Sequence, residues 1–242
     1  MSGHSKWSNI KRKKEIQDKQ KGKVFGKLSR LITLAVIEGG GKTNPDSNVK
    51  LRLVIDKAKQ SNMPKDNIER AIDKGTGPNN QLIKEVVYEA FGLHGVALLI
   101  ETTTDNHNRT TAEIRSLLER KGGKLGNQGS VSYLFEKCGS VILPKATNKE
   151  EVVFIFAEKV SAIDINEDEA YYQVFFPYEF LGKLKDYSIN LDIESSEVDY
   201  RPKIKVEIKA GEQANKIIEL IEALEDLNDV HKVSANFTII NS

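Results

Sequence analysis

The sequence has few of the residues that carry covalent, redox or metal chemistry. Its 242 residues include one cysteine, Cys138, one tryptophan and four scattered histidines. A single cysteine excludes an internal disulfide framework and fits a reducing compartment. No Cys/His pair has the spacing of a zinc site, and no G-x-S-x-G nucleophile motif occurs. We therefore predict a protein that is not an enzyme, with no catalytic residue and no metal site.

Long apolar runs are also missing. No stretch approaches the roughly eighteen apolar residues that a membrane span requires. Residues 1–23 are polar and basic, so they lack the apolar core of a secretory signal. We expect a cytoplasmic protein without a membrane partner.

The net charge of +1 conceals two regions of opposite sign. Residues 1–74 contain 18 Lys and Arg against 8 Asp and Glu, whereas residues 75–242 contain 18 against 27. A cationic N-terminal region joined to an acidic remainder is typical of a protein that binds a polyanion at one end.

The first thirty residues hold ten of these cations and only two acids. Such a row can neutralise successive phosphates and release their counterions, and the indole of Trp7 can stack on a base. The alternative is a solvated basic face with Trp7 packed on the helices. The charge ratio favours a nucleic-acid contact. The candidate nucleic-acid-binding residues are Lys6, Trp7, Lys11, Arg12, Lys13, Lys14, Lys19, Lys21, Lys23, Lys27 and Arg30.

Apolar residues at helical intervals predict three N-terminal helices, at about 21–38, at about 48–60, and from Pro64 to a stop at Gly75. The third would be the recognition helix if this region were a helix-turn-helix. Its polar positions include three acids against three cations, and phosphates would repel those acids. We therefore expect recognition of the nucleic-acid backbone or shape, without sequence-specific readout by this helix.

The stretch EGGGKT at residues 38–43 resembles the end of a phosphate-binding P-loop. That motif, G-x-x-x-x-G-K-[ST], requires its first glycine at residue 36, which is Val36. A helical pattern precedes the glycines, and the turn residues Asn-Pro-Asp follow them. The run is therefore interpreted as a helix stop and hinge.

Beyond the N-terminal region, strands alternate with helices. A buried strand is predicted at 95–104, followed by a turn and a helix in which Thr110 and Glu113 have the spacing of a capping box. A second strand is predicted at 129–136. The last forty residues predict strand, helix and strand.

The predicted fold class is α+β, with a helical N-terminal domain followed by two ferredoxin-like α+β domains, one inserted in the other. The insert follows a β-α-β-β-α-β order and is acidic, so it offers either a protein-binding surface or only a solubilising one. The predicted domains are a basic helical domain at 1–76, a discontinuous α+β domain at 77–136 plus 203–242, and the inserted acidic α+β domain at 137–202.

A polar loop follows the strand predicted at 95–104. Its Asn106, Asn108 and Arg109 form a secondary candidate site, because amides and a guanidinium can contact phosphates or RNA base edges. An Asx-rich turn with a helix cap is the simpler interpretation, and the residues alone favour it. A small pocket formed by Asp105, Arg109 and Glu113 is the remaining enzymatic alternative.

Four long motifs run in order along essentially the whole chain. They are GHSKWSNIK at 3–11, NPDSNVKLRLVIDKAKQSNMPKDNIERAIDKG at 44–75, TDNHNRTTAEIRSLLERKGGKLGNQGSV at 104–131 and ALEDLNDVHKVSANF at 223–237. Together they resemble the YebC family, which includes bacterial probable transcriptional regulators and the mitochondrial translational activator of cytochrome oxidase.

The resemblance implies three domains, a helical one and two α+β domains of which one is inserted in the other, with no catalytic activity and no cofactor. It implies either DNA-binding transcriptional control, the usual assignment of bacterial members, or assistance to the ribosome through difficult nascent sequences such as proline runs. GHSKW begins at residue 3, which leaves no room for a mitochondrial transit peptide and indicates a bacterial-type cytoplasmic protein.

The residues favour a non-catalytic, nucleic-acid-binding regulator of gene expression. The basic N-terminus, the acid-balanced third helix and the polar loop favour a ribosome- or RNA-associated translation factor. The alternative is a DNA-binding transcriptional regulator. The expected partner is rRNA, the ribosome or DNA.

Overall fold

The computed structural model describes residues 21–77 and 83–240. Its N-terminal part is helical, as the periodicity predicts, with α2 (Lys21–Glu38), α3 (Val49–Gln60) and α4 (Lys65–Thr76). Asn48 caps α3, because its side-chain oxygen accepts the backbone N–H of Leu51 at 3.0 Å. The apolar faces of the three helices form one core, which includes Leu28, Ile32, Val36, Leu51, Ile55, Ile68 and Ala71.

Two details of α4 differ from the prediction. Pro64 stands at the N-cap, and Gly75 lies inside the helix, which continues to Thr76. Gly75 is buried against α2, where a Cβ atom would lie 2.6 Å from the Cβ of Val36. The glycine therefore permits close packing of two helices and is not a stop signal.

The glycine run ends α2, as the sequence predicts. Gly40 and Gly41 have φ angles of 68° and 81°, in the left-handed region that glycine enters without steric cost. The N–H of Gly41 donates to the carbonyl of Val36 at 2.9 Å, and the Asn48 side chain donates to that of Ala35 at 2.8 Å. The run is thus a helix cap.

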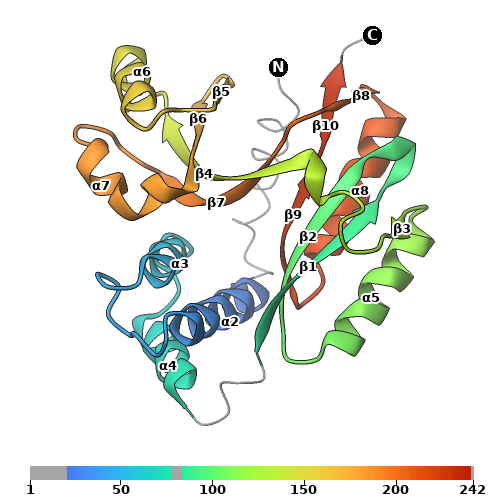
Figure 1. The fold of residues 1–242 in the computed structure, drawn as a ribbon, viewed down its shortest axis with the longest axis horizontal. Coiled ribbons are helices and arrows are strands. Elements are labelled where there is room, and N and C mark those ends of the chain that lie inside the picture. Colours follow the sequence, from blue (N-terminus) through green and yellow to red (C-terminus); the bar gives the residue numbers. More distant parts are fainter. Residues whose placement is uncertain (1–20, 78–82, 241–242) are drawn as a thin grey trace.

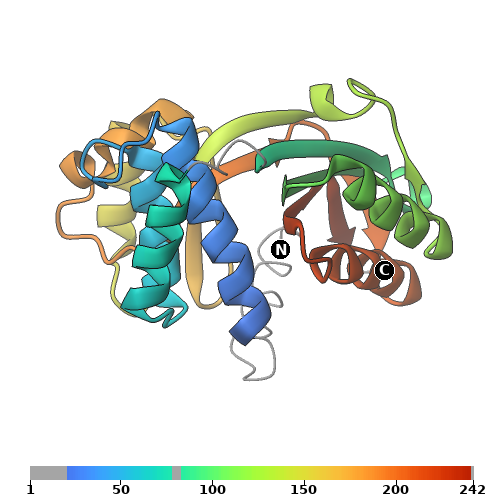
Figure 2. The same ribbon diagram turned by 90° about the horizontal axis from the view of Figure 1, so that it is seen from below.

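A four-stranded antiparallel sheet, here the outer sheet, has the strand order β3-β1-β2-β9. Helices α5 and α8 cover one of its faces, and their apolar stripes form its core (Figure 2). The strand predicted at 95–104 is present as β2. The elements are β1 (Lys84–Phe91), β2 (Ala97–Thr104), α5 (His107–Arg120), β3 (Lys124–Leu125), α8 (Glu212–Glu225) and β9 (Val230–Ala235).

The structure corrects the prediction near this sheet. Strand β1 was not predicted. The strand predicted at 129–136 begins only at Phe135. The Glu89 carboxylate accepts the backbone N–H groups of Gly129, Val131 and Ser132 and holds residues 129–132 in a turn. A short 3-10 helix (Ser132–Leu134) then leads into β4.

The predicted last strand is also broken in two. Asn236 separates β9 from β10 (Phe237–Ile240), and its side-chain oxygen accepts the N–H of Ala97 at 2.7 Å. Strand β10 leaves the outer sheet and pairs in parallel with β8 (Val206–Lys209).

A second antiparallel sheet, here the inserted sheet, has the order β5-β6-β4-β7. This is the strand order of a ferredoxin-like β-α-β-β-α-β unit (Figure 1). The elements are β4 (Phe135–Pro144), α6 (Glu150–Lys159), β5 (Asp164–Glu167), β6 (Tyr171–Phe176), a 3-10 helix (Tyr178–Lys183) with α7 (Leu184–Tyr187), and β7 (Ser195–Pro202).

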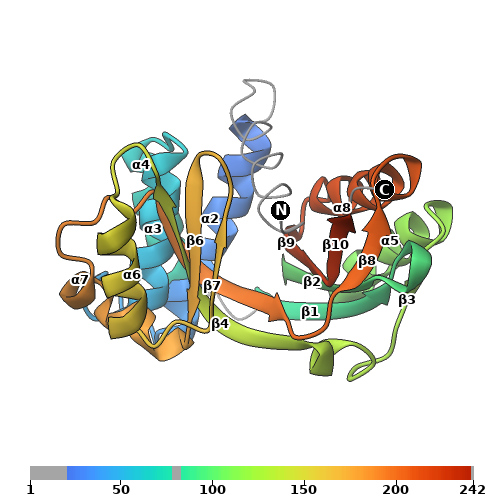
Figure 3. The same ribbon diagram turned by 90° about the horizontal axis from the view of Figure 1, so that it is seen from above.

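Helices α2 to α4 lie beside the inserted sheet, and β4 and β7 run from it toward the outer sheet (Figure 3). Arg52 of α3 donates to the carbonyl of Gly182 at 3.0 Å, and Lys57 pairs with Glu197 of β7 at 3.1 Å. The fold class is therefore α+β, with an N-terminal helical region. The domain limits at 76, 136 and 202 remain a proposal, and β4 crosses the second of them. No helix within 21–77 or 83–240 has the length and apolarity to span a membrane.

Candidate nucleic-acid interface

Seven of the eleven candidate basic-segment residues lie outside the described part of the chain. They are Lys6, Trp7, Lys11, Arg12, Lys13, Lys14 and Lys19. The remaining four lie on α2, in its first three turns, so they can be placed against the rest of the fold.

Lys21 and Lys23 are exposed at the start of α2. The first turn of this helix contains no acidic residue. Cations at a helix N-terminus lie next to the positive end of the helix dipole, which disfavours them unless an anion is near. This end of α2 is therefore an electropositive surface suited to phosphate.

Lys27 and Arg30 point to a different part of the molecule. Lys27 donates to the carbonyl of Glu225, the last residue of α8, and Arg30 donates to that of Asn228, in the turn between α8 and β9. Free carbonyls at the end of a helix attract cations. These two candidates thus connect the helical region to the outer sheet, and they are already engaged within the chain.

Asp229, which the sequence reasoning did not single out, is the centre of this contact. It is 3% exposed, and its Oδ1 lies 3.4 Å from Arg30. Its Oδ2 accepts hydrogen bonds from Arg109 at 2.7 Å, Thr110 at 2.7 Å and Thr104 at 3.2 Å. Burial alone would raise the pKa of Asp229, but the bonds from Arg109 and Thr110 and the two arginine charges hold it below its usual value.

The secondary polar loop is a helix cap, which is the simpler of the two sequence interpretations. The Asn106 side chain accepts the N–H of Arg109 at 3.1 Å and caps α5. The Thr110–Glu113 capping box is therefore wrong: Thr110 is buried inside α5, where it donates to Asp229. Asn108 is exposed.

Arg109 bridges two carboxylates. Its guanidinium contacts Asp105 at 2.9 Å and Asp229 at 2.7 Å, and the bond to Asp229 raises its pKa further above the ordinary value. Asp105 is exposed and Glu113 is exposed. The suggested pocket of Asp105, Arg109 and Glu113 is thus an ion-paired surface turn, which lacks the paired environments that separate an acid from a base.

The structure brings the two candidate sites together. Arg30 of α2 and Arg109 of the polar loop contact opposite oxygens of the same carboxylate. Residues 30 and 229 are far apart in sequence, so no local pattern could have revealed this contact. Arg109 keeps 45% of its side chain exposed and Arg30 keeps 32%, so both reach the surface.

Two cations of α4 contact polar side chains of the same helix. Lys65 lies 3.4 Å from Glu69, and Arg70 donates to the side chain of Asn67 at 2.9 Å. That α4 does not read a base sequence remains a prediction.

Two family models match the chain. The model described as "TACO1/YebC protein N-terminal domain" matches residues 5–78. The model described as "TACO1/YebC second and third domain" matches residues 83–237. Similar curated proteins are named "Probable transcriptional regulatory protein". One from Persephonella marina is 44% identical, over 98% of this chain and 96% of that protein, and one from Aquifex aeolicus is 42% identical, over 99% and 96%.

A solved structure is also similar. The crystal structure of the conserved hypothetical protein Aq1575 from Aquifex aeolicus superposes with a TM-score of 0.85 and 40% identity, over 93% of each chain. The family models together cover nearly the whole sequence, and the relatives agree along its length. The chain therefore belongs to the TACO1/YebC family.

Proposed function

We propose that this protein is a non-catalytic regulator of gene expression that binds nucleic acid through its basic N-terminal segment and the first turn of α2. The observation that carries this proposal is the exposed, acid-free start of α2, directly after a segment rich in Lys and Arg. Without Lys27 and Arg30, which are engaged within the chain, residues 1–23 hold eight cations against two acids, enough charge for several phosphate contacts.

The proposed mode of binding is through the phosphate backbone. The cations of α4 are balanced by acids, so this helix supplies no electropositive face for a groove. Arg109 shares the Asp229 carboxylate with Arg30, and with its exposed chain neighbour Asn108 it can extend the contact surface beyond α2. Phosphate contacts fix position and strength of binding, and carry little sequence information.

DNA is the first target to test, because the relatives are named as probable transcriptional regulatory proteins. A ribosome- or RNA-associated translation factor is the second candidate. Two observations favour it: the acid-balanced α4, and a polar loop whose amide groups suit RNA base edges. Either role fits the proposed cytoplasmic location.

The test is fluorescence anisotropy with a labelled DNA duplex, a scrambled duplex and a structured RNA across a salt series. Replacing Lys11, Arg12, Lys13 and Lys14 with Ala, or Lys21 and Lys23 with Ala, should weaken binding and flatten its salt dependence. For the pair on α2 the log–log slope should fall by about 2. Lys203, which directly follows β7, and Lys209, the last residue of β8, are exposed cations that provide a charge-matched control when changed to Ala.

The outcomes separate the candidates. Preference for particular duplexes indicates the transcriptional role, whereas preference for RNA and co-sedimentation with ribosomes at moderate salt indicates the translational one. Unchanged affinity in both cationic variants would reject the proposed surface.

The inserted domain is the proposed site for a protein partner. Helix α6 exposes Phe154 and Ile155, 51% and 53% accessible, between Glu151 and Glu158 on the same face. An acidic rim around two apolar side chains suits a basic partner with apolar anchors.

A further inference from the structure

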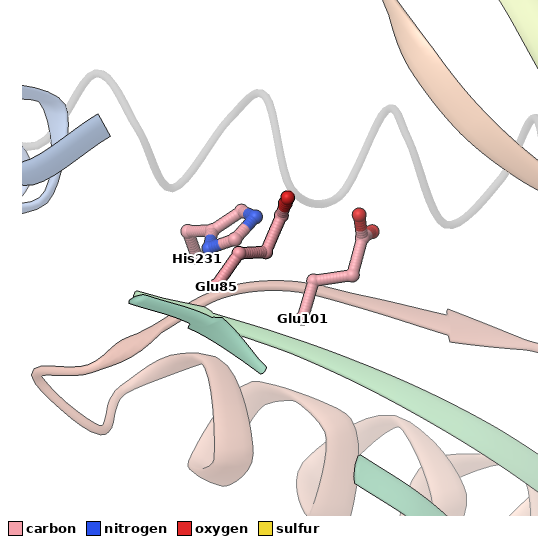
Figure 4. Close-up of side chains that lie close together, drawn as sticks. All are labelled: Glu85, Glu101 and His231. Atoms are coloured by element: carbon pink, nitrogen blue, oxygen red, sulfur yellow. The ribbon is translucent and has the colours of Figure 1, made fainter. Parts of the chain in front are cut away.

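Three side chains converge on the face of the outer sheet that α5 and α8 leave uncovered. Glu85 comes from β1, Glu101 from β2 and His231 from β9. One potential ligand atom from each lies within 4.8 Å of the others. Figure 4 shows the three side chains rising side by side from neighbouring strands.

A β-bulge brings the histidine to this face. Glu101 pairs with Lys232 and Thr102 pairs with Val230, so His231 is the extra residue on β9. In a regular strand His231 and Lys232 would point to opposite faces. Bulges commonly re-aim a side chain next to a functional site.

Glu101 is a buried carboxylate, and one of its two oxygens has no hydrogen-bond donor. It is 6% exposed, and its Oε1 has no hydrogen-bond partner. Buried carboxylates are normally paired, hydrogen-bonded or bound to a metal, because leaving one unsatisfied is costly. The unpaired oxygen belongs to the same cluster as the Glu85 carboxylate and the His231 ring.

Among the residues that the structure describes, the neighbouring ammonium groups form their short ion pairs with carboxylates other than Glu101. Lys232, the cross-strand neighbour of Glu101, is bound to Glu197 at 2.7 Å and Asp199 at 2.8 Å. Lys50 pairs with Glu85 at 2.9 Å. Within the described residues, five carboxylates meet three ammonium groups at this junction. The carboxylates are Glu38, Glu85, Glu101, Glu197 and Asp199, and the ammonium groups are Lys50, Lys57 and Lys232.

We propose that Glu85, Glu101 and His231 bind a divalent first-row transition-metal ion, with Zn²⁺ as the best match. Two carboxylate oxygens and one imidazole nitrogen are a donor set that Zn²⁺ accepts, with water completing the coordination. Bonds of about 2.0–2.1 Å place tetrahedral ligand atoms roughly 3.3 Å apart. The present separations, all within 4.8 Å, exceed this spacing by at most about 1.5 Å.

Two neighbouring side chains should affect the metal affinity of this site. Thr103 Oγ1 lies 3.5 Å from His231 Nδ1, in position to orient the ring. Lys50 holds Oε2 of Glu85 and competes with the metal for that carboxylate. The first neighbour should favour metal binding and the second should oppose it.

The experiment measures Zn²⁺ affinity of the full, tag-free, metal-stripped protein by competition with a chromophoric chelator. Wild type should bind one equivalent. Glu101→Gln and His231→Gln should each weaken binding by at least about tenfold, the scale that loss of even an outer partner produces. Exposed Glu113→Gln and His94→Gln are matched controls and should bind as wild type.

The Lys50→Met variant should change the Zn²⁺ affinity in the direction opposite to the ligand variants. Removing the competing ammonium group should tighten Zn²⁺ binding several-fold, an effect that general disruption of the fold does not produce. Circular dichroism should show the same helix and strand content for all variants. Absence of Zn²⁺ binding by wild type, or binding that neither Glu101→Gln nor His231→Gln weakens, overturns the proposal.

Discussion

Asp229 and Glu101 are two buried carboxylates of the same sheet region, and they differ in their partners. Asp229 is 3% exposed, accepts bonds from Arg109, Thr110 and Thr104, and faces Arg30. Glu101 is 6% exposed, and one of its oxygens has no partner. The environments move their acidities apart: the pKa of Asp229 is lowered, whereas burial raises the pKa of Glu101 to about 7, against the opposing charge of Lys232.

The difference separates a structural contact from an open site. A carboxylate with several donors stabilises the fold by holding distant segments together, here α2, the polar loop and the start of β9. A buried carboxylate with an oxygen that accepts no hydrogen bond contributes little to the stability of the fold, and that oxygen is available to a ligand. The following variants test this distinction, from the largest expected effect to the smallest.

Asp229→Asn should be the most damaging substitution. The amide keeps one acceptor but loses the charge that binds Arg30 and Arg109, and its NH₂ group faces their donors. Charge-assisted bonds of this kind contribute about 1.5–3 kcal/mol, so the free energy of unfolding should fall by about 2–3 kcal/mol in urea denaturation. Asp105→Asn is the control, because its pair with Arg109 is exposed and contributes less than about 1 kcal/mol. Equal losses in both variants would contradict the central role of Asp229.

Glu89→Gln should reduce stability by about 2 kcal/mol and alter its pH dependence. Burial alone would raise the pKa of Glu89, but hydrogen bonds from the backbone of Val131, Gly129 and Ser132 lower it. A lowered folded-state pKa contributes stability above the unfolded pKa, about 4.3, and loses it as pH falls through the folded value. Denaturation between about pH 3 and 7 should show a loss on acidification that is smaller in the variant. A variant with the same acid loss as wild type would show that other carboxylates dominate.

Arg30→Met should have a modest effect, about 1 kcal/mol or less. Its side chain is 32% exposed and lies 3.4 Å from Asp229, so solvent screens the pair. The methionine keeps much of the apolar stem. Thermal unfolding with a fluorescent dye should show a small decrease in Tm, while a decrease as large as that of Asp229→Asn would make Arg30 the principal partner of the carboxylate.

Glu101→Gln should change stability least in the absence of metal, by about 0.5 kcal/mol or less in either direction. The substitution removes a buried charge and breaks no hydrogen bond at Oε1. Chemical denaturation in the presence of a chelator measures this. A loss comparable to that of Asp229→Asn would show that Glu101 has partners equivalent to those of Asp229 and would erase the contrast between the two groups.

The sequence revealed the features that depend on neighbouring residues. The three helices follow from apolar residues three and four positions apart, and the glycine cap after Glu38 follows from local turn chemistry. The ferredoxin-like order of the insert follows from alternating strand and helix patterns. Strand β1 carries a similar signal, since Val86, Tyr88 and Ala90 alternate toward the core, and this pattern was overlooked.

Features that depend on contacts between distant segments could not be predicted. Gly75 has the sequence context of a helix stop, and only its contact with Val36 explains it. Arg30 looks like any other cation of the basic segment until Asp229 is placed beside it. The histidine of the proposed metal site depends on a bulge, which changes the face of one residue and leaves no clear mark in the sequence.

Strand β4 connects the outer sheet to the inserted sheet. Phe135 at its start is buried with Ala97 and Leu99 of the outer sheet, and its remainder lies in the inserted sheet. With β7 it forms a continuous ribbon paired from Phe135 to Ile142. The insert is thus attached through a two-stranded β-ribbon, and the first residue of that ribbon packs on β2, the strand that carries Glu101.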